Sequence, residues 1–233
     1  QDFFFLRRSA HIRPAPRARA VKRLGRSLAM SEGRLKMLVL GSSVAAGHNC
    51  EPLTEGWAHL LAKALKERGV DTVNMAVPGT NVAHWAEQLA TGEAATQLAT
   101  FDMVLLSLSL GNEGLSDAKG AEAAHSLAER YIAGYGGLAE AARRLMRPGA
   151  RLVLGGPYPN GGYGDFHLQA IRKVYDAARD WKDVDYFIDF LAAPLHDGCG
   201  KWGEGFMSDA GHPNEAGHKC MFDCVDLGRI LGQ

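Results

Sequence analysis

Hydrophobic residues from Leu35 onward gather in short runs that alternate with segments of helical period. The runs have the length of buried strands, and they cover residues 35–40, 72–77, 103–110, 151–154 and 184–190. Between them, apolar residues recur three and four positions apart, which is typical of amphipathic helices. This period predicts helices over residues 55–68, 82–98, 121–146, 166–181 and 214–231, the third of which can break at Gly134, Gly136 and Gly137.

Strands that are apolar throughout and separated by helices belong to parallel sheets with both faces covered. The pattern therefore predicts an α/β protein, a three-layer α/β/α sandwich around a five-stranded parallel sheet. In such sheets the ligand binds beyond the carboxyl ends of the strands. We therefore look for chemistry in the residues that directly follow each strand.

Those residues are rich in glycine and in polar side chains. Three segments of this kind, which we call turns, lie at the ends of predicted strands and run beyond them, at residues 41–47, 74–81 and 110–114. A fourth precedes the last helix at residues 208–214. Because the carboxyl ends of parallel strands lie at one edge of the sheet, the four turns are expected to meet there.

The turns contain every group that ester hydrolysis by a serine requires. Ser43 is the candidate nucleophile, His212 the base, and Asp209, three residues earlier, the carboxylate that orients the imidazole. Donors for the oxyanion would be the backbone N–H groups of Ser43 and Gly79 and the side-chain amide of Asn112. Each residue alone is more often a turn or a helix cap, so the prediction depends on the ordered set.

The four turns resemble the characteristic blocks of the SGNH or GDSL hydrolase superfamily, over about residues 35–231. The matching positions are Ser43 in the Gly-Asp-Ser turn, Gly79, Asn112, and Asp209 with His212 in the Asp-x-x-His pair. The resemblance implies a flavodoxin-like fold and hydrolysis of acyl or acetyl esters through an acyl-enzyme, with no cofactor. Superfamily substrates include lipid acyl esters, thioesters and O-acetylated sugars, and some members are acyltransferases.

This sequence departs from the superfamily pattern at four positions. Ser42 replaces the usual Asp, Val44 the usual Leu, and Glu113 the usual Asp, while Pro78 occupies a position where a small residue such as Ser is common. None of the four removes a catalytic group. The departures indicate a divergent branch and weaken any inference about substrate preference.

Further residues near the four turns are candidates for contact with substrate. His48 and His84 follow the first and second turns, and either can instead be a surface residue. Tyr158 and Tyr163 lie in the glycine-rich segment 155–164 after the fourth strand. This segment is predicted to be either a substrate wall or a flexible loop.

Two other kinds of site find less support. His196, Cys199, His212 and His218 have no compact ligand spacing, so no metal is expected. Cys50 and Cys199 each lie near a catalytic turn, and whether they pair is open. A catalytically silent glycan- or lipid-binding module on the same fold remains an alternative to an esterase, as does an acyltransferase.

Charge divides the chain into two parts. Residues 1–34 contain nine Lys or Arg against two acidic residues, whereas residues 35–233 contain 17 against 24. The N-terminal part is predicted to be a basic extension: a transit-type segment that would imply an organelle, an arm for anionic partners, or leftover sequence. The acidic hydrolase domain, residues 35–233, gives no nucleic-acid footprint. No apolar run has the length of a membrane span, and the compartment and oligomeric state are open.

Overall fold

The computed structural model describes residues 34–192, 194–198 and 200–233. The basic extension up to residue 33 and the thiol of Cys199 lie outside these ranges, so the expectations about both remain predictions. Within the described ranges, no helix combines the length and the apolar character needed to cross a bilayer.

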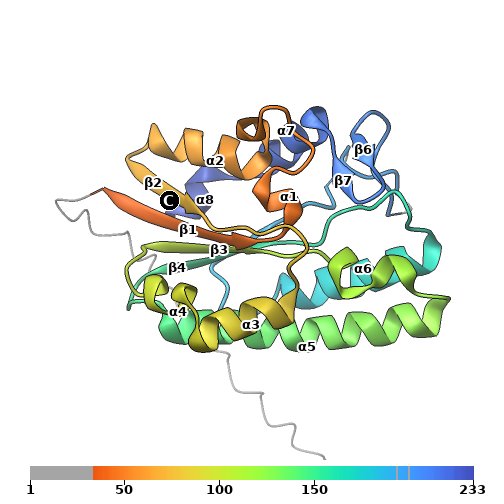
Figure 1. Ribbon diagram of the computed structural model, residues 1–233, viewed down its shortest axis with the longest axis horizontal. Coiled ribbons are helices and arrows are strands. Elements are labelled where there is room, and N and C mark those ends of the chain that lie inside the picture. The colour runs from red at the N-terminus through yellow and green to blue at the C-terminus, as the bar shows by residue number, and fades with distance from the viewer. Residues whose placement is uncertain (1–33, 193, 199) are drawn as a thin grey trace, which may run out of the picture.

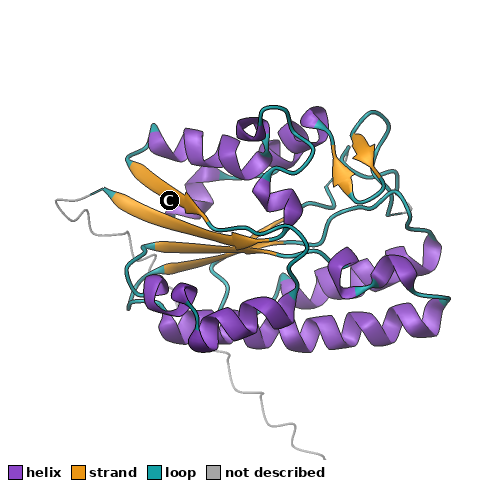
Figure 2. Ribbon diagram, viewed as in Figure 1, coloured by secondary structure: helices purple, strands orange, loops and turns teal. Residues whose placement is uncertain are grey.

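Five parallel strands form the central sheet, in the spatial order β2-β1-β3-β4-β5. Figure 1 shows the strands side by side between two layers of helices, and Figure 2 separates the three layers by secondary structure. The strand bounds are β1 (Leu35–Gly41), β2 (Val70–Asn74), β3 (Met103–Ser107), β4 (Arg151–Gly155) and β5 (Tyr186–Ile188). This strand order is the flavodoxin-like one, and the predicted three-layer α/β/α sandwich is confirmed.

Helices cover both faces of the sheet (Figure 1). One face carries α1 (Ser43–Ala46), α2 (Trp57–Lys66), α7 (Glu215–Asp223) and α8 (Leu227–Leu231), with the 3-10 turn η1 (Leu53–Glu55) before α2. The other face carries α3 (Val82–Thr91), α4 (Glu93–Leu98), α5 (Ala121–Leu145) and α6 (Asp165–Ala178). Two 3-10 turns follow β3, η2 (Gly111–Glu113) and η3 (Leu115–Asp117), and a small hairpin pairs β6 (Met207–Asp209) with β7 (His212–Pro213).

The alternation of side chains along each strand divides the core into two clusters. In β1, Leu38 and Leu40 pack toward α3–α6, whereas Met37 and Val39 pack toward α2, α7 and α8. Both sets of side chains are almost wholly buried. Burial on both faces explains why the strand appears in the sequence as an unbroken apolar run.

Three predicted helices differ from the observed ones. The segment 82–98 is two helices, because the chain is extended at Gly92. The segment 214–231 is also two, and the Asp226 side chain caps the second by accepting the N–H of Arg229. By contrast, α5 runs unbroken through its glycines. There, a Cβ on Gly134 would lie 3.0 Å from Val82 of α3, so the glycine allows the two helices to pack closely.

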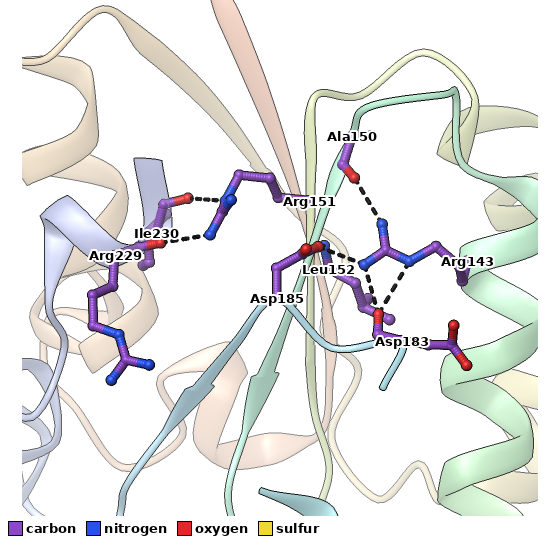
Figure 3. A network of polar contacts seen from close by, with 8 residues as sticks. All are labelled: Arg143, Ala150, Arg151, Leu152, Asp183, Asp185, Arg229 and Ile230. Carbon is purple, nitrogen blue, oxygen red and sulfur yellow. Dashed lines mark hydrogen bonds and ion pairs between the residues drawn. The ribbon is translucent and has the colours of Figure 1, made fainter. Parts of the chain in front are cut away.

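A network of charged groups fixes the amino-terminal edge of the sheet, opposite the turns of interest (Figure 3). Arg143, near the end of α5, donates to the carbonyl oxygens of Ala150 and Asp183 and to the Asp185 carboxylate. The same carboxylate accepts the N–H of Leu152 in β4 at 2.8 Å. Beside it, Arg151 donates to the carbonyl oxygens of Arg229 and Ile230 in α8.

Replacing Asp185 by Ala should destabilise the protein without affecting its site. The change removes the acceptor of a backbone N–H and of Arg143, and hydrogen bonds to charged groups contribute about 1.5–3 kcal/mol each. We expect the free energy of unfolding, measured in urea, to fall by about 2 kcal/mol. Asp183→Ala is the matched control, because its carboxylate points away from the network (Figure 3). An equal loss of stability in both variants would contradict the assigned role.

Candidate active site

Ser43 is the first residue of α1 and directly follows β1. The turn requires glycine two residues earlier, since a Cβ on Gly41 would lie 2.6 Å from the Cβ of Ala45 and 2.8 Å from the carbonyl oxygen of Ser107. The strand can therefore pass directly into the short helix. This places Ser43, 6% exposed, at the carboxyl end of the central strand.

The hairpin of β6 and β7 brings His212 and Asp209 to this serine. The Nε2 atom of His212 lies 3.0 Å from the Oγ atom of Ser43. Its Nδ1 atom lies 2.8 and 3.0 Å from the two carboxylate oxygens of Asp209. A carboxylate can only accept, so Nδ1 carries the proton and Nε2 is free to accept one from the serine hydroxyl. The structure thus brings together the three residues expected to act together.

Asn49 was not among the residues expected in the site, yet it contacts the same carboxylate. Its backbone is left-handed, with φ 66°, a conformation that Asn tolerates better than most residues. Its side-chain NH₂ donates to Asp209 Oδ2 at 2.7 Å, and the N–H of Gly211 donates to Oδ1 at 2.8 Å. Partial burial acts to raise the pKa of Asp209, but the hydrogen bonds from His212, Asn49 and Gly211 outweigh it and lower the pKa.

Two further histidines lie near the imidazole of His212. The exposed ring of His48, a predicted substrate contact, lies 4.5 Å from that of His212, centroid to centroid. Behind it, the wholly buried His218 accepts the N–H of Trp57 and contacts the carbonyl oxygen of His48. Burial lowers the pKa of His218 to about 4, so its ring is neutral near neutral pH and supports the His48 backbone.

The second and third turns are joined to each other and to the first. The hydroxyl of Thr80 donates to the carbonyl oxygen of Gly41 at 3.0 Å, and the side chain of Asn112 donates to the carbonyl oxygen of Thr80 at 2.8 Å. Gly79 has φ 80°, and a Cβ there would meet nothing within 4 Å. Its backbone is therefore open to an approaching ligand.

The structure explains one departure from the superfamily pattern. Glu113, which replaces an Asp, accepts the N–H of Val82 at 2.7 Å. Its carboxylate therefore lies at the amino-terminal end of α3, where a negative charge is favourable. The longer side chain ties the third turn to the helix that follows the second, and this holds the neighbouring Asn112 in place.

Two of the predicted substrate contacts are largely buried. Tyr158 and Tyr163 are only 6% and 1% exposed, and their rings stack on Trp202 and His167. Both rings belong to the hydrophobic core, and their contact with substrate stays a prediction. His84 is half-buried and lies edge-on against Trp85, and no contact joins it to Ser43 or His212 among the described residues.

No cluster of three or more metal-ligating side chains occurs in the part of the chain that the structure describes. Of the histidines considered for zinc, His212 faces Ser43 and Asp209, whereas His218 faces the backbone of α2. His196 accepts the N–H of Gly198 through Nδ1. These three rings therefore have separate partners.

Comparison with known structures finds the same fold in several proteins, among them an acetylxylan esterase and a lipase. TesA is 24% identical, with a TM-score of 0.58 over 82% of this chain and 95% of its own. The acetylxylan esterase Axe2 from Geobacillus stearothermophilus is 17% identical, with a TM-score of 0.60 over 88% and 97%. The lipase Lip_vut3 from a goat rumen metagenome is 15% identical, with a TM-score of 0.63 over 82% and 95%.

Comparison with curated proteins gives no match. The sequence profile of the GDSL-like lipase/acylhydrolase family, however, matches residues 39–220, which is most of the chain. All four glycine-rich and polar turns lie within that range. Together with the strand order and the shared architecture, this match shows that the chain belongs to the GDSL-like lipase/acylhydrolase family.

Proposed function

We propose that this protein is a serine esterase that hydrolyses carboxylic esters through an acyl-enzyme. The observation that carries the proposal is the distance of 3.0 Å between Ser43 Oγ and His212 Nε2, with Asp209 on the other ring nitrogen. A nucleophile, a base and an orienting carboxylate in this order are what acyl transfer requires. Membership of a family of lipases and acylhydrolases supports the same chemistry.

In the proposed mechanism, the same three residues serve both halves of the reaction. Ser43 Oγ attacks the ester carbonyl carbon while its proton passes to His212 Nε2, and Asp209 stabilises the resulting imidazolium. The same proton then passes to the departing alcohol oxygen, which leaves the acyl group on Ser43. In the second half, water gives a proton to Nε2 and attacks the acyl carbon, and Ser43 departs with that proton.

The charge that develops on the carbonyl oxygen needs donors that are already in place. We assign this role to the backbone N–H groups of Ser43 and Gly79 and to the side-chain amide of Asn112. Supporting this, Gly79 is open to a ligand, and Asn112 spends only one of its two N–H donors on Thr80. Loss of one such donor typically costs about 10²–10³ in kcat.

Labelling with a fluorophosphonate probe tests the proposal directly. Such a probe phosphonylates a serine only when a neighbouring base activates it, so the wild-type chain should be modified at Ser43. The adduct is located by peptide mass spectrometry, and Ser43→Ala should remain unlabelled. Ser42→Ala is the matched control, because Ser42 is adjacent in sequence but wholly buried. Labelling in this control should persist.

The outcomes also separate the alternatives. An unlabelled wild-type chain would contradict the esterase and favour a silent binding module on the same fold. A labelled chain that converts an activated ester mainly to a new ester when alcohol is added would instead be an acyltransferase. Product analysis with and without glycerol distinguishes transfer from hydrolysis.

A further inference from the structure

A largely buried asparagine from outside the four turns lies close to two of them. Asn160, in the loop between β4 and α6, is 9% exposed. Figure 1 shows this loop beside the β6–β7 hairpin, and the N–H of Gly161 donates to the carbonyl oxygen of Ala210 at 2.6 Å. The loop that carries Asn160 is thus fixed to the hairpin that carries His212.

The orientation of the Asn160 amide is determined by its own loop. The N–H of Gly162 lies 2.8 Å from Oδ1 of Asn160, and an N–H can only donate. The accepting atom is therefore the amide oxygen, and the NH₂ group faces the opposite way. The backbone N–H of Asn160 donates to the carbonyl oxygen of Gly200, and this hydrogen bond fixes the backbone of the residue.

The NH₂ group points between two of the turns. Its nitrogen lies 3.6 Å from the position that a Cβ on Gly111 would occupy and 3.9 Å from the corresponding position on Gly211. These glycines directly precede Asn112 and His212. Among the described residues, the only hydrogen bond of the Asn160 side chain is the one that its oxygen accepts. The nitrogen is not one of the fully buried unpartnered side-chain atoms, so a ligand can reach it.

We propose that Asn160 is a further substrate-binding residue, whose NH₂ group donates to an oxygen of the tetrahedral intermediate. This inference rests on the esterase proposed above. Asn112 is placed beside the carbonyl oxygen, and His212 beside the departing alcohol oxygen. A donor between Asn112 and His212 faces the carbonyl oxygen and the departing alcohol oxygen. Negative charge develops on the first as the intermediate forms and on the second as it collapses. Neither glycine has a side chain that would separate the amide from this position.

Two substitutions of Asn160 distinguish a residue that donates to the substrate from one that only stabilises its own loop. Asn160→Asp keeps an oxygen to accept the N–H of Gly162 but replaces the donor with negative charge. Asn160→Ala removes both. If the donor acts on the reacting oxygens, kcat should fall about 10²-fold in the Ala variant, and at least tenfold further in the Asp variant. If Asn160 only stabilises its loop, the order of kcat reverses, and the Ala variant has the lower kcat.

The measurement is steady-state hydrolysis of a short-chain p-nitrophenyl ester, with both variants assayed well below their unfolding midpoints. Gln169→Glu is the matched control: it makes the same amide-to-carboxylate change at an exposed position of α6, the helix that follows the Asn160 loop. Its kcat should stay within about twofold of wild type, since surface changes are usually near neutral. Equal losses in the two Asn160 variants, or a worse Ala variant, would overturn the proposal.

Failure of this proposal is distinguishable from failure of the esterase itself. Fluorophosphonate labelling of the wild-type chain is carried out first, and a positive result establishes the activated serine independently of Asn160. The rate of labelling then gives a second readout, because the phosphonyl oxygen takes the place of the substrate carbonyl oxygen. Slower labelling in the order wild type, Ala, Asp supports the donor, and unchanged labelling in both variants contradicts it.

Discussion

Replacing His212 by Ala should lower kcat for a short-chain ester on the order of 10⁶-fold, the scale seen when a serine hydrolase loses its base. The imidazole is the only base in contact with the Ser43 hydroxyl among the described residues. Neither neighbouring histidine can replace it. His218 faces the backbone of Trp57, and His48 contacts the His212 ring rather than the serine. Residual turnover would come from the oxyanion donors and from binding alone.

The control for this substitution is His125→Ala. His125 lies on the exposed surface of α5, where it pairs with Glu129. Its removal should leave kcat within about twofold of wild type, because it is a surface change far from the catalytic turns. Far-UV circular dichroism and thermal unfolding check that both variants are folded, because fluorophosphonate cannot titrate a serine that has lost its base. If His212→Ala retained more than about 1% of wild-type turnover, the assignment of the base would be wrong.

The sequence was sufficient to predict the sheet because each strand is buried on both faces. Leu38 and Val39 point to opposite faces of β1 and are both excluded from solvent, so the strand appears as a continuous apolar run. The meeting of the polar turns was predictable for a related reason. Parallel strands place their carboxyl ends at one edge, so the polar turns after them were expected to converge.

Helix ends were less predictable, because packing and side-chain caps decide them. The three glycines of α5 suggested a break, but Gly134 and Gly136 instead give room to Val82 and Trp181. These partners are far away in sequence, and no local rule identifies them. Tertiary contacts outweigh the low helix propensity of glycine in this helix.

The side chains that support the site depend on contacts over still longer separations. Asn49 reaches Asp209 across 160 residues, and His218 reaches the backbone of His48 across 170. No spacing in the sequence marks either pair. Asn160 lay within the segment proposed as a substrate wall, but the tyrosines on either side of it were the expected contacts. The two tyrosine rings pack in the core, whereas the small amide of Asn160 is the group that we propose to contact substrate.

Replacing Asp209 by Asn should lower kcat about 10⁴-fold near neutral pH while the protein stays folded. The carboxylate now accepts the Nδ1 proton of His212, so that Nε2 can accept the proton of Ser43. An amide can donate its own N–H to Nδ1, which favours the tautomer with the proton on Nε2. That ring can no longer act as a base toward the serine.

The Asp209→Asn substitution keeps the shape of the side chain and removes its charge. Asn49 and Gly211 donate to different oxygens of the carboxylate, so an amide of the same shape keeps one of these bonds. The hydrogen bonds that lower the pKa of Asp209 keep the carboxylate charged as the pH falls below neutrality. Its favourable effect on the imidazolium is therefore lost only once the pH falls through that lowered pKa.

Asp223→Asn is a close match as a control, because its side chain is 55% exposed against 52% for Asp209. It pairs with Lys219 on the surface of α7, and an exposed ion pair of this kind contributes about 0.3–0.5 kcal/mol. Its kcat should therefore be unchanged. The test is to measure kcat of both variants across the pH range, with thermal unfolding of each to show that it is folded. If Asp209→Asn stayed within about tenfold of wild type, His212 would not depend on Asp209 for its tautomer, and the proposed division of roles between the two residues would be wrong.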